Sequence, residues 1–161
     1  MYYLGIDFGT SFTKAVVFDS QSGKYTSVKI GTGHNSDTDQ LPTVAFYTYG
    51  KMNLYIGDLA INSKLQPGGE FFYNFKPKMD TLNENSDLYE TLLQIVKKFF
   101  LHIKECTEKQ FSQTFEEVVI TVPASAPTEG IRYQMMRKLL RKRVSTILRL
   151  FRSPLLQHTV Y

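Results

Sequence analysis

The 161-residue chain has no tryptophan and one cysteine, Cys106, and it has no long hydrophobic run. A single cysteine cannot form an internal disulfide, and no basic-then-apolar leader precedes the first patterned segment, so we expect a reducing, cytoplasmic compartment. A membrane-spanning helix needs about 20 consecutive apolar residues, which the sequence lacks, so we expect no membrane partner. The three histidines are scattered and form no metal-binding triad.

Acidic residues are absent from the last part of the chain. All 15 lie at or before Glu129, whereas eight of the 19 basic residues follow it. The first 130 residues are therefore mildly acidic, and the remainder is strongly basic. A nucleic-acid partner is not expected for the acidic body, and the basic segment is considered separately below.

The hydrophobic content, 42% with 14% aromatic residues, is enough for one sizeable core. Strand-like runs bounded by Gly, Asn, Asp or Ser occur at residues 2–8, 13–19, 24–30, 42–48 and 52–56. A helical repeat of apolar residues begins after Ser86, a predicted N-cap, and runs for about five turns. A buried-strand pattern returns at 117–122, Pro123 ends it, and Pro127 opens another helix. This order predicts a mixed α/β sheet with flanking helices.

The candidate site is the turn Gly9-Thr10-Ser11 that follows the first predicted strand. Backbone N–H groups and hydroxyls at such a turn can hold phosphate oxygens, and Gly9 allows the backbone to come close. Asp7 at the strand end could hold magnesium through its water shell, since that ion needs only one or two carboxylates. The alternative is an ordinary hairpin in which Asp7 and Ser11 only satisfy turn amides.

Three segments, in order, resemble one family. Residues 4–19 resemble the first phosphate motif of the actin-like ATPases, heat-shock chaperones and sugar kinases. Residues 41–46 are similar to the Ile-Pro-Ser-Val-Val-x-Phe strand of the heat shock protein 70 family, and residues 119–124 are nearly identical to its Val-Ile-Thr-Val-Pro-Ala strand. The resemblance implies a ribonuclease-H-like (actin-like ATPase) fold, ATP and magnesium as cofactors, and hydrolysis coupled to closure of a two-lobed cleft.

The resemblance also implies roles for single residues. Asp7 would organise the magnesium water shell, and Gly9, Thr10 and Ser11 would bind the β- and γ-phosphates. Phe12 stands where the chaperones usually have Tyr. Lys14 is spaced like the phosphate-binding lysine of actin-like members, where most heat-shock chaperones have a small polar residue; a solvated lysine is the alternative.

Lys76 follows an aromatic run, residues 71–75, that resembles the one before the catalytic lysine of the chaperones. That lysine stabilises charge developing on the γ-phosphate and positions the attacking water. The following Pro-Lys-Met-Asp departs from the family's Arg-Leu-Ile-Gly, so Lys78 is a weaker second candidate, and a surface lysine is the alternative.

Beyond about residue 138 the resemblance stops. We interpret residues 1–138 as an incomplete first lobe of the ATPase domain and 139–161 as a basic tail outside the family. Codons for the tail can be chosen so that the neighbouring frame reads the family's Ala-Gly and Glu-Pro segment, which predicts a frameshift. The alternative is a basic amphipathic helix over residues 137–152 that binds an anionic surface.

Three function classes therefore remain open. The first is a fragment of a chaperone-type ATPase, without the second phosphate loop and adenosine pocket and so inactive alone. Client proteins and co-chaperones are implied by the family only. The second is a fragment of an actin-like or sugar-kinase-like ATPase, which Lys14 favours. The third is a non-enzymatic module that binds anionic surfaces through the tail.

Overall fold

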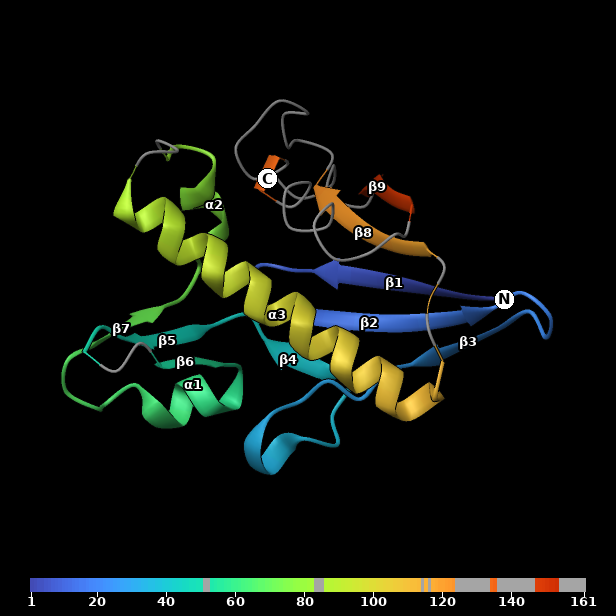
Figure 1. The fold of residues 1–161 in the computed structure, drawn as a ribbon, viewed down its shortest axis with the longest axis horizontal. Coiled ribbons are helices and arrows are strands. Elements are labelled where there is room, and N and C mark those ends of the chain that lie inside the picture. The colour runs from blue at the N-terminus through green and yellow to red at the C-terminus, as the bar shows by residue number, and fades with distance from the viewer. Residues whose placement is uncertain are drawn as a thin grey trace, which may run out of the picture.

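The computed structural model describes residues 1–50, 53–82, 86–113, 115, 117–123, 134–135 and 147–153. These residues form a mixed α/β structure with two β-sheets and one long helix, α3 (Figure 1). The α/β class predicted from the sequence is confirmed. Within the described residues, no helix has the length and apolar character needed to cross a bilayer.

The larger sheet has β1 at its centre. Its strands lie in the order β3 (Lys24–Ser27), β2 (Phe12–Asp19), β1 (Tyr2–Phe8), β8 (Glu117–Pro123) and β9 (Ile147–Ser153), with β4 (Gln40–Pro42) paired to the first part of β2. β1 runs antiparallel to β2 and parallel to β8. A parallel neighbour needs a crossover connection, and α3 lies within the one that leads to β8.

The smaller sheet contains β6 (Asn53–Ile56), β5 (Ala45–Thr48) and β7 (Gly69–Phe72), with α1 (Asp58–Ser63) between β6 and β7 in the chain. The sequence predicted one strand over 42–48, but the chain divides between β4 and β5. At this break Thr43 N–H donates to Ser11 O (2.8 Å), and Val44 O accepts from Gly57 N–H (3.0 Å). The break occurs because these backbone groups bind the first turn and the start of α1.

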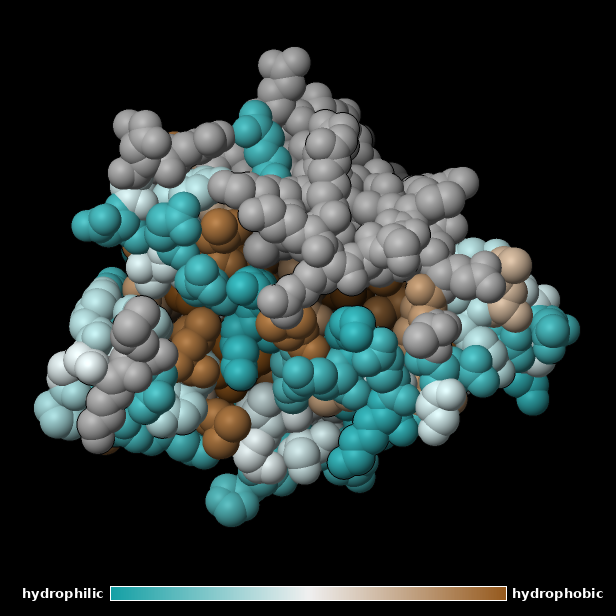
Figure 2. All heavy atoms as spheres, in the orientation of Figure 1, coloured by the Kyte–Doolittle hydropathy of each residue, from teal (hydrophilic) through white to brown (hydrophobic). Residues whose placement is uncertain are grey.

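α3 (Asp87–Phe111) covers one face of the larger sheet (Figure 1). Ser86 caps it as predicted, since its hydroxyl accepts from Tyr89 N–H (3.2 Å). The helix has 25 residues, about seven turns rather than five, because it continues to a left-handed C-cap at Ser112. Figure 2 shows hydrophilic side chains along its outer side, with hydrophobic side chains visible beside them.

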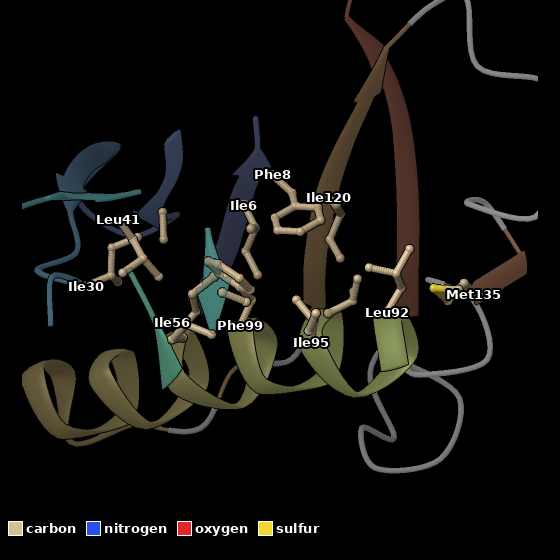
Figure 3. Close-up of a cluster of buried hydrophobic side chains, with 14 of the residues drawn as sticks. Ile6, Phe8, Ile30, Leu41, Ile56, Leu92, Ile95, Phe99, Ile120 and Met135 are labelled. Carbon is tan, nitrogen blue, oxygen red and sulfur yellow. The ribbon is translucent and has the colours of Figure 1, made fainter. Parts of the chain in front are cut away.

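The main core lies between β1 and α3. Alternate residues of β1 point to this face, and they meet apolar residues three or four positions apart on the helix (Figure 3). The Phe8 ring lies 5.5 Å from that of Phe99, in an edge-on arrangement typical of aromatic pairs. Its fully buried members include Phe8, Leu92, Ile95, Val96, Phe99, Ile103 and Ile120.

Three expectations concern the C-terminal part. The alternative helix over residues 137–152 is wrong at its end, because Ile147–Ser153 form β9, paired in parallel with β8. The helix expected to open at Pro127 begins outside the described residues. Residues 134–135, which are described, are helical. The boundary proposed near residue 138 also lies outside them.

Removing one methyl group from the core tests this packing. We expect Ile95→Val to lower the free energy of unfolding by about 0.5–1.5 kcal/mol, because Ile95 is fully buried against the sheet. Leu65→Ala is the control, since Leu65 is exposed, and should change it by less than about 0.5 kcal/mol. Urea unfolding followed by circular dichroism measures both; equal effects would contradict the packing.

Candidate functional site

The predicted phosphate turn connects β1 to β2 at one end of the larger sheet. Phe8 pairs with Thr13, so residues 9–11 form the turn and Phe12 begins β2. Glycine is required at position 9 because there is no room for a side chain: an added Cβ would lie 2.2 Å from the carbonyl oxygen of Phe12. A side chain at this position would open the turn.

Polar groups of the turn face solvent. Thr10 and Ser11 are exposed, and no hydrogen-bond partner for their N–H groups or hydroxyls is found in the part of the chain that the structure describes. Ser11 O accepts the bond from Thr43 N–H, which fixes the turn against β4. The arrangement therefore holds two amides and two hydroxyls available to an anion.

Asp7 is exposed on the face of β1 opposite α3. It pairs with Lys14 of β2 on one side and with Thr121 of β8 on the other. The Thr121 hydroxyl donates a hydrogen bond to Asp7 Oδ1 (2.8 Å). Within residues 1–50, Asp7 and Lys14 do not form an ion pair. The ammonium of Lys14 and the carboxylate of Asp7 thus flank the turn as separate charges.

Lys76 reaches the residue before the turn from a short helix that follows β7. It begins α2 (Lys76–Met79), is only 3% exposed, and its ammonium donates a hydrogen bond to the carbonyl oxygen of Phe8. The same ammonium lies 4.7 Å from the centre of the Phe8 ring, in cation–π geometry. The surface-lysine alternative is therefore wrong for Lys76, whereas Lys78 is exposed.

The three family-like segments meet at this turn. β4 pairs with β2 through Phe12 and Pro42, and the buried hydroxyls of Thr13 and Thr43 lie 2.9 Å apart. β8 contributes Thr121 through its pairing with β1. Phe12 itself begins β2 and is 48% exposed. Residues separated by more than a hundred positions in the chain thus surround one turn.

Sequence reasoning missed Thr43 and Thr121 as parts of the site. Both lie inside segments that carry the family resemblance, but neither residue was given a role in the site. The signal that could have found Thr121 is its position on the strand: parallel pairing of residues 117–121 with β1 places it beside Asp7. That register was not readable from either segment alone.

Asp7 is the carboxylate beside the turn. No group of three or more His, Cys, Asp or Glu residues able to hold a metal occurs among the described residues. Asp7 would be a lone carboxylate, which fits an ion that keeps its waters and takes its remaining ligands from phosphate. Cys106 lies away from the turn on α3, and burial raises the pKa of its thiol, which makes it a poor nucleophile.

No protein-family model matches this sequence, and no curated protein matches it either.

Substitution of Gly9 tests the close approach in the turn. We expect Gly9→Ala to cost about 1–3 kcal/mol of stability and to shift the amide NMR signals of residues 9–12, because the new Cβ collides with Phe12 O. Gly50→Ala is the matched control, since a Cβ there meets nothing within 4 Å. Unchanged turn signals in Gly9→Ala would contradict the geometry.

Proposed function

We propose that this chain is the phosphate-binding part of an ATP-binding domain of the heat shock protein 70 type, with the ribonuclease-H-like fold of the actin-like ATPases. One observation carries the proposal: the family-like segments at 4–19, 41–46 and 119–124, together with Lys76, converge on a single turn with available amides and hydroxyls. An ordinary hairpin would not require this convergence. A cytoplasmic location belongs to the same proposal.

In this proposal the N–H groups and hydroxyls of Thr10 and Ser11 bind phosphate oxygens directly. Gly9 allows the close approach to Phe12 O that sets the shape of the turn. Asp7 holds the water shell of magnesium, which neutralises phosphate charge when it is bound. Lys76 places a positive charge behind the turn, where its contact with Phe8 O orients the carbonyl that precedes Gly9.

The turn contacts phosphate from one side only. Phosphate oxygens on the other side keep their contacts with water, so the net gain per hydrogen bond is small. The second glycine-rich loop and the catalytic carboxylate implied by the resemblance are not found in these 161 residues. Weak binding of ATP and no measurable hydrolysis by this chain alone follow from the proposal.

An NMR titration with ATP and magnesium tests it. We expect a dissociation constant well above about 1 μM, with shifts confined to the amides of residues 9–14. Asp7→Asn should remove the dependence on magnesium, because the metal's water shell loses its carboxylate. Asp37→Asn, which alters an exposed carboxylate in the loop before β4, is the control and should bind as the unmodified chain does.

Two results would count against the proposal. Shifts spread over the surface, with none at the turn, would indicate non-specific binding. A submicromolar affinity by calorimetry would mean that the chain contains a complete site, contrary to the one-sided arrangement.

The second candidate is a fragment of an actin-like or sugar-kinase-like ATPase. Lys14 favours it, since this lysine is exposed, lies directly across from Asp7, and forms no ion pair with it in residues 1–50. A lysine in this position can reach a phosphate bound by the neighbouring turn.

Lys14→Ala distinguishes the two candidates. If Lys14 binds phosphate, ATP affinity should fall about three- to tenfold, as expected for a partly solvated charge contact. In a site of the chaperone type, the affinity should change by less than about twofold. Lys24→Ala is the matched control, because it removes an exposed lysine from β3 of the same sheet. The same NMR titration measures all three proteins.

A further inference from the structure

The strand β7 ends the smaller sheet, so one of its sides pairs with β5 and the other side pairs with no strand that the structure describes (Figure 1). In an antiparallel pair, the backbone groups of alternate residues point to the partner strand. Tyr49 N–H donates to Gly68 O (3.2 Å), so Gly68 and every second residue after it face β5. The backbone groups of Gly69, Phe71 and Tyr73 therefore point away from the sheet.

This open edge carries two aromatic rings on one face. The ring centroids of Phe71 and Tyr73 lie 6.2 Å apart in a stacked arrangement, as expected for residues two positions apart on a strand. Tyr73 is 67% exposed, and Phe71 is partly exposed. Gly69 is exposed and cannot be replaced freely, because an added Cβ would lie 2.4 Å from the ring of Phe46. A large ring thus stands at one end of the edge and a residue without a side chain at the other.

The free edge of the larger sheet, at β3, is treated differently. The side-chain amide of Gln110 donates to Lys29 O (2.7 Å) and accepts from Lys29 N–H (3.0 Å), as a neighbouring strand would. Lys24 adds a charge to the same strand. Covering side chains and lysines are means by which proteins protect sheet edges from strand addition. Residues 69–73 contain no lysine, and among the described residues no side chain is found bonded to their outward backbone groups.

The β7 edge matches the same edge of a second copy. In an antiparallel pair of two β7 strands centred on Phe71, this residue lies opposite Phe71 of the other copy, and Tyr73 lies opposite Gly69. The pair therefore sets ring against ring, and the exposed tyrosine against the residue that has no side chain. The outward N–H and C=O groups of all three residues would be paired in this one register. Such self-complementarity is what a two-fold interface requires.

The acidic residue of the strand does not oppose this pairing. In the same register Glu70 lies opposite Phe72 of the other copy and not opposite a second Glu70. Its carboxylate also accepts a hydrogen bond from the hydroxyl of Tyr49 in its own chain. Like charges directly opposite one another, which would destabilise the pair, are therefore avoided.

We propose that the β7 edge is a self-association surface, at which two copies of this chain join their smaller sheets through an antiparallel β7–β7 pair. The surface is short, so the dimer is weak, with a dissociation constant above about 10 μM. This inference is independent of the proposed nucleotide-binding function, because the turn at residues 9–11 belongs to the larger sheet.

Sedimentation equilibrium of the 161-residue chain, from about 10 μM to about 1 mM, tests the inference, and we expect a monomer–dimer equilibrium. Phe71→Lys and Phe71→Glu each set like charges opposite one another across the two-fold axis. Each should weaken association at least about tenfold. An equimolar mixture of the two variants sets lysine opposite glutamate and should associate more tightly than either variant alone. This recovery is expected only if the residue meets its own counterpart.

Two further variants complete the comparison. Tyr73→Ala should weaken association about threefold or more, and it provides a second reading if the Phe71 variants do not fold, since Tyr73 is exposed. Tyr25→Lys is the matched control: it changes an exposed aromatic residue on β3, the edge strand of the larger sheet, and should leave association unchanged. Circular dichroism checks that each variant is folded.

Several results would overturn the inference. They are a chain that stays monomeric at about 1 mM, association that Phe71→Lys or Tyr73→Ala leaves unchanged, a mixture no tighter than its components, and an equal loss in Tyr25→Lys. None of them bears on ATP binding, which is measured at the amides of residues 9–14. Absence of ATP binding by a chain that still dimerises would overturn the proposed function alone.

Discussion

The alternation of side chains along β1 is the constraint on which the rest of the structure depends. Leu4, Ile6 and Phe8 point to α3 and form the core, so Asp7 must point to the opposite face. A shift of one residue in the pairing would exchange the two sets, which the burial of Phe8 against α3 prevents. The same packing that stabilises the sheet thus holds the carboxylate at the turn, beside the two strands that pair with β1.

Most of the larger sheet could be predicted from the sequence, because its elements carry local signals. The alternating run in β1, the turn at Gly9 and the N-cap Ser86 are each readable within a few residues. β7, α1 and α2 were not predicted, since these elements are only four to six residues long and depend on packing with distant segments. The break between β4 and β5 has the same origin: it is imposed by hydrogen bonds to Ser11 and Gly57, not by the residues at the break.

The candidate site, too, could be predicted from the sequence only in part. Asp7 and the Gly-Thr-Ser turn are contiguous in the chain, so their chemistry could be inferred from residue types and order. Lys76 could be identified as a candidate only through the family resemblance. The structure adds that its side chain is buried and bonded to Phe8 O, which no sequence pattern contains. Thr43 and Thr121 contribute through strand pairing alone. Pairing between segments 30 or 114 positions apart has no local signature.

The contact between Lys76 and Phe8 also links the two sheets mechanically. Lys76 follows the last residue of β7 by four positions, whereas Phe8 is the last residue of β1. A displacement that moves Lys76 beyond the reach of its side chain would break this bond or pull on the carbonyl that precedes Gly9. The shape of the turn after β1 and the position of α2 are therefore coupled through this one contact.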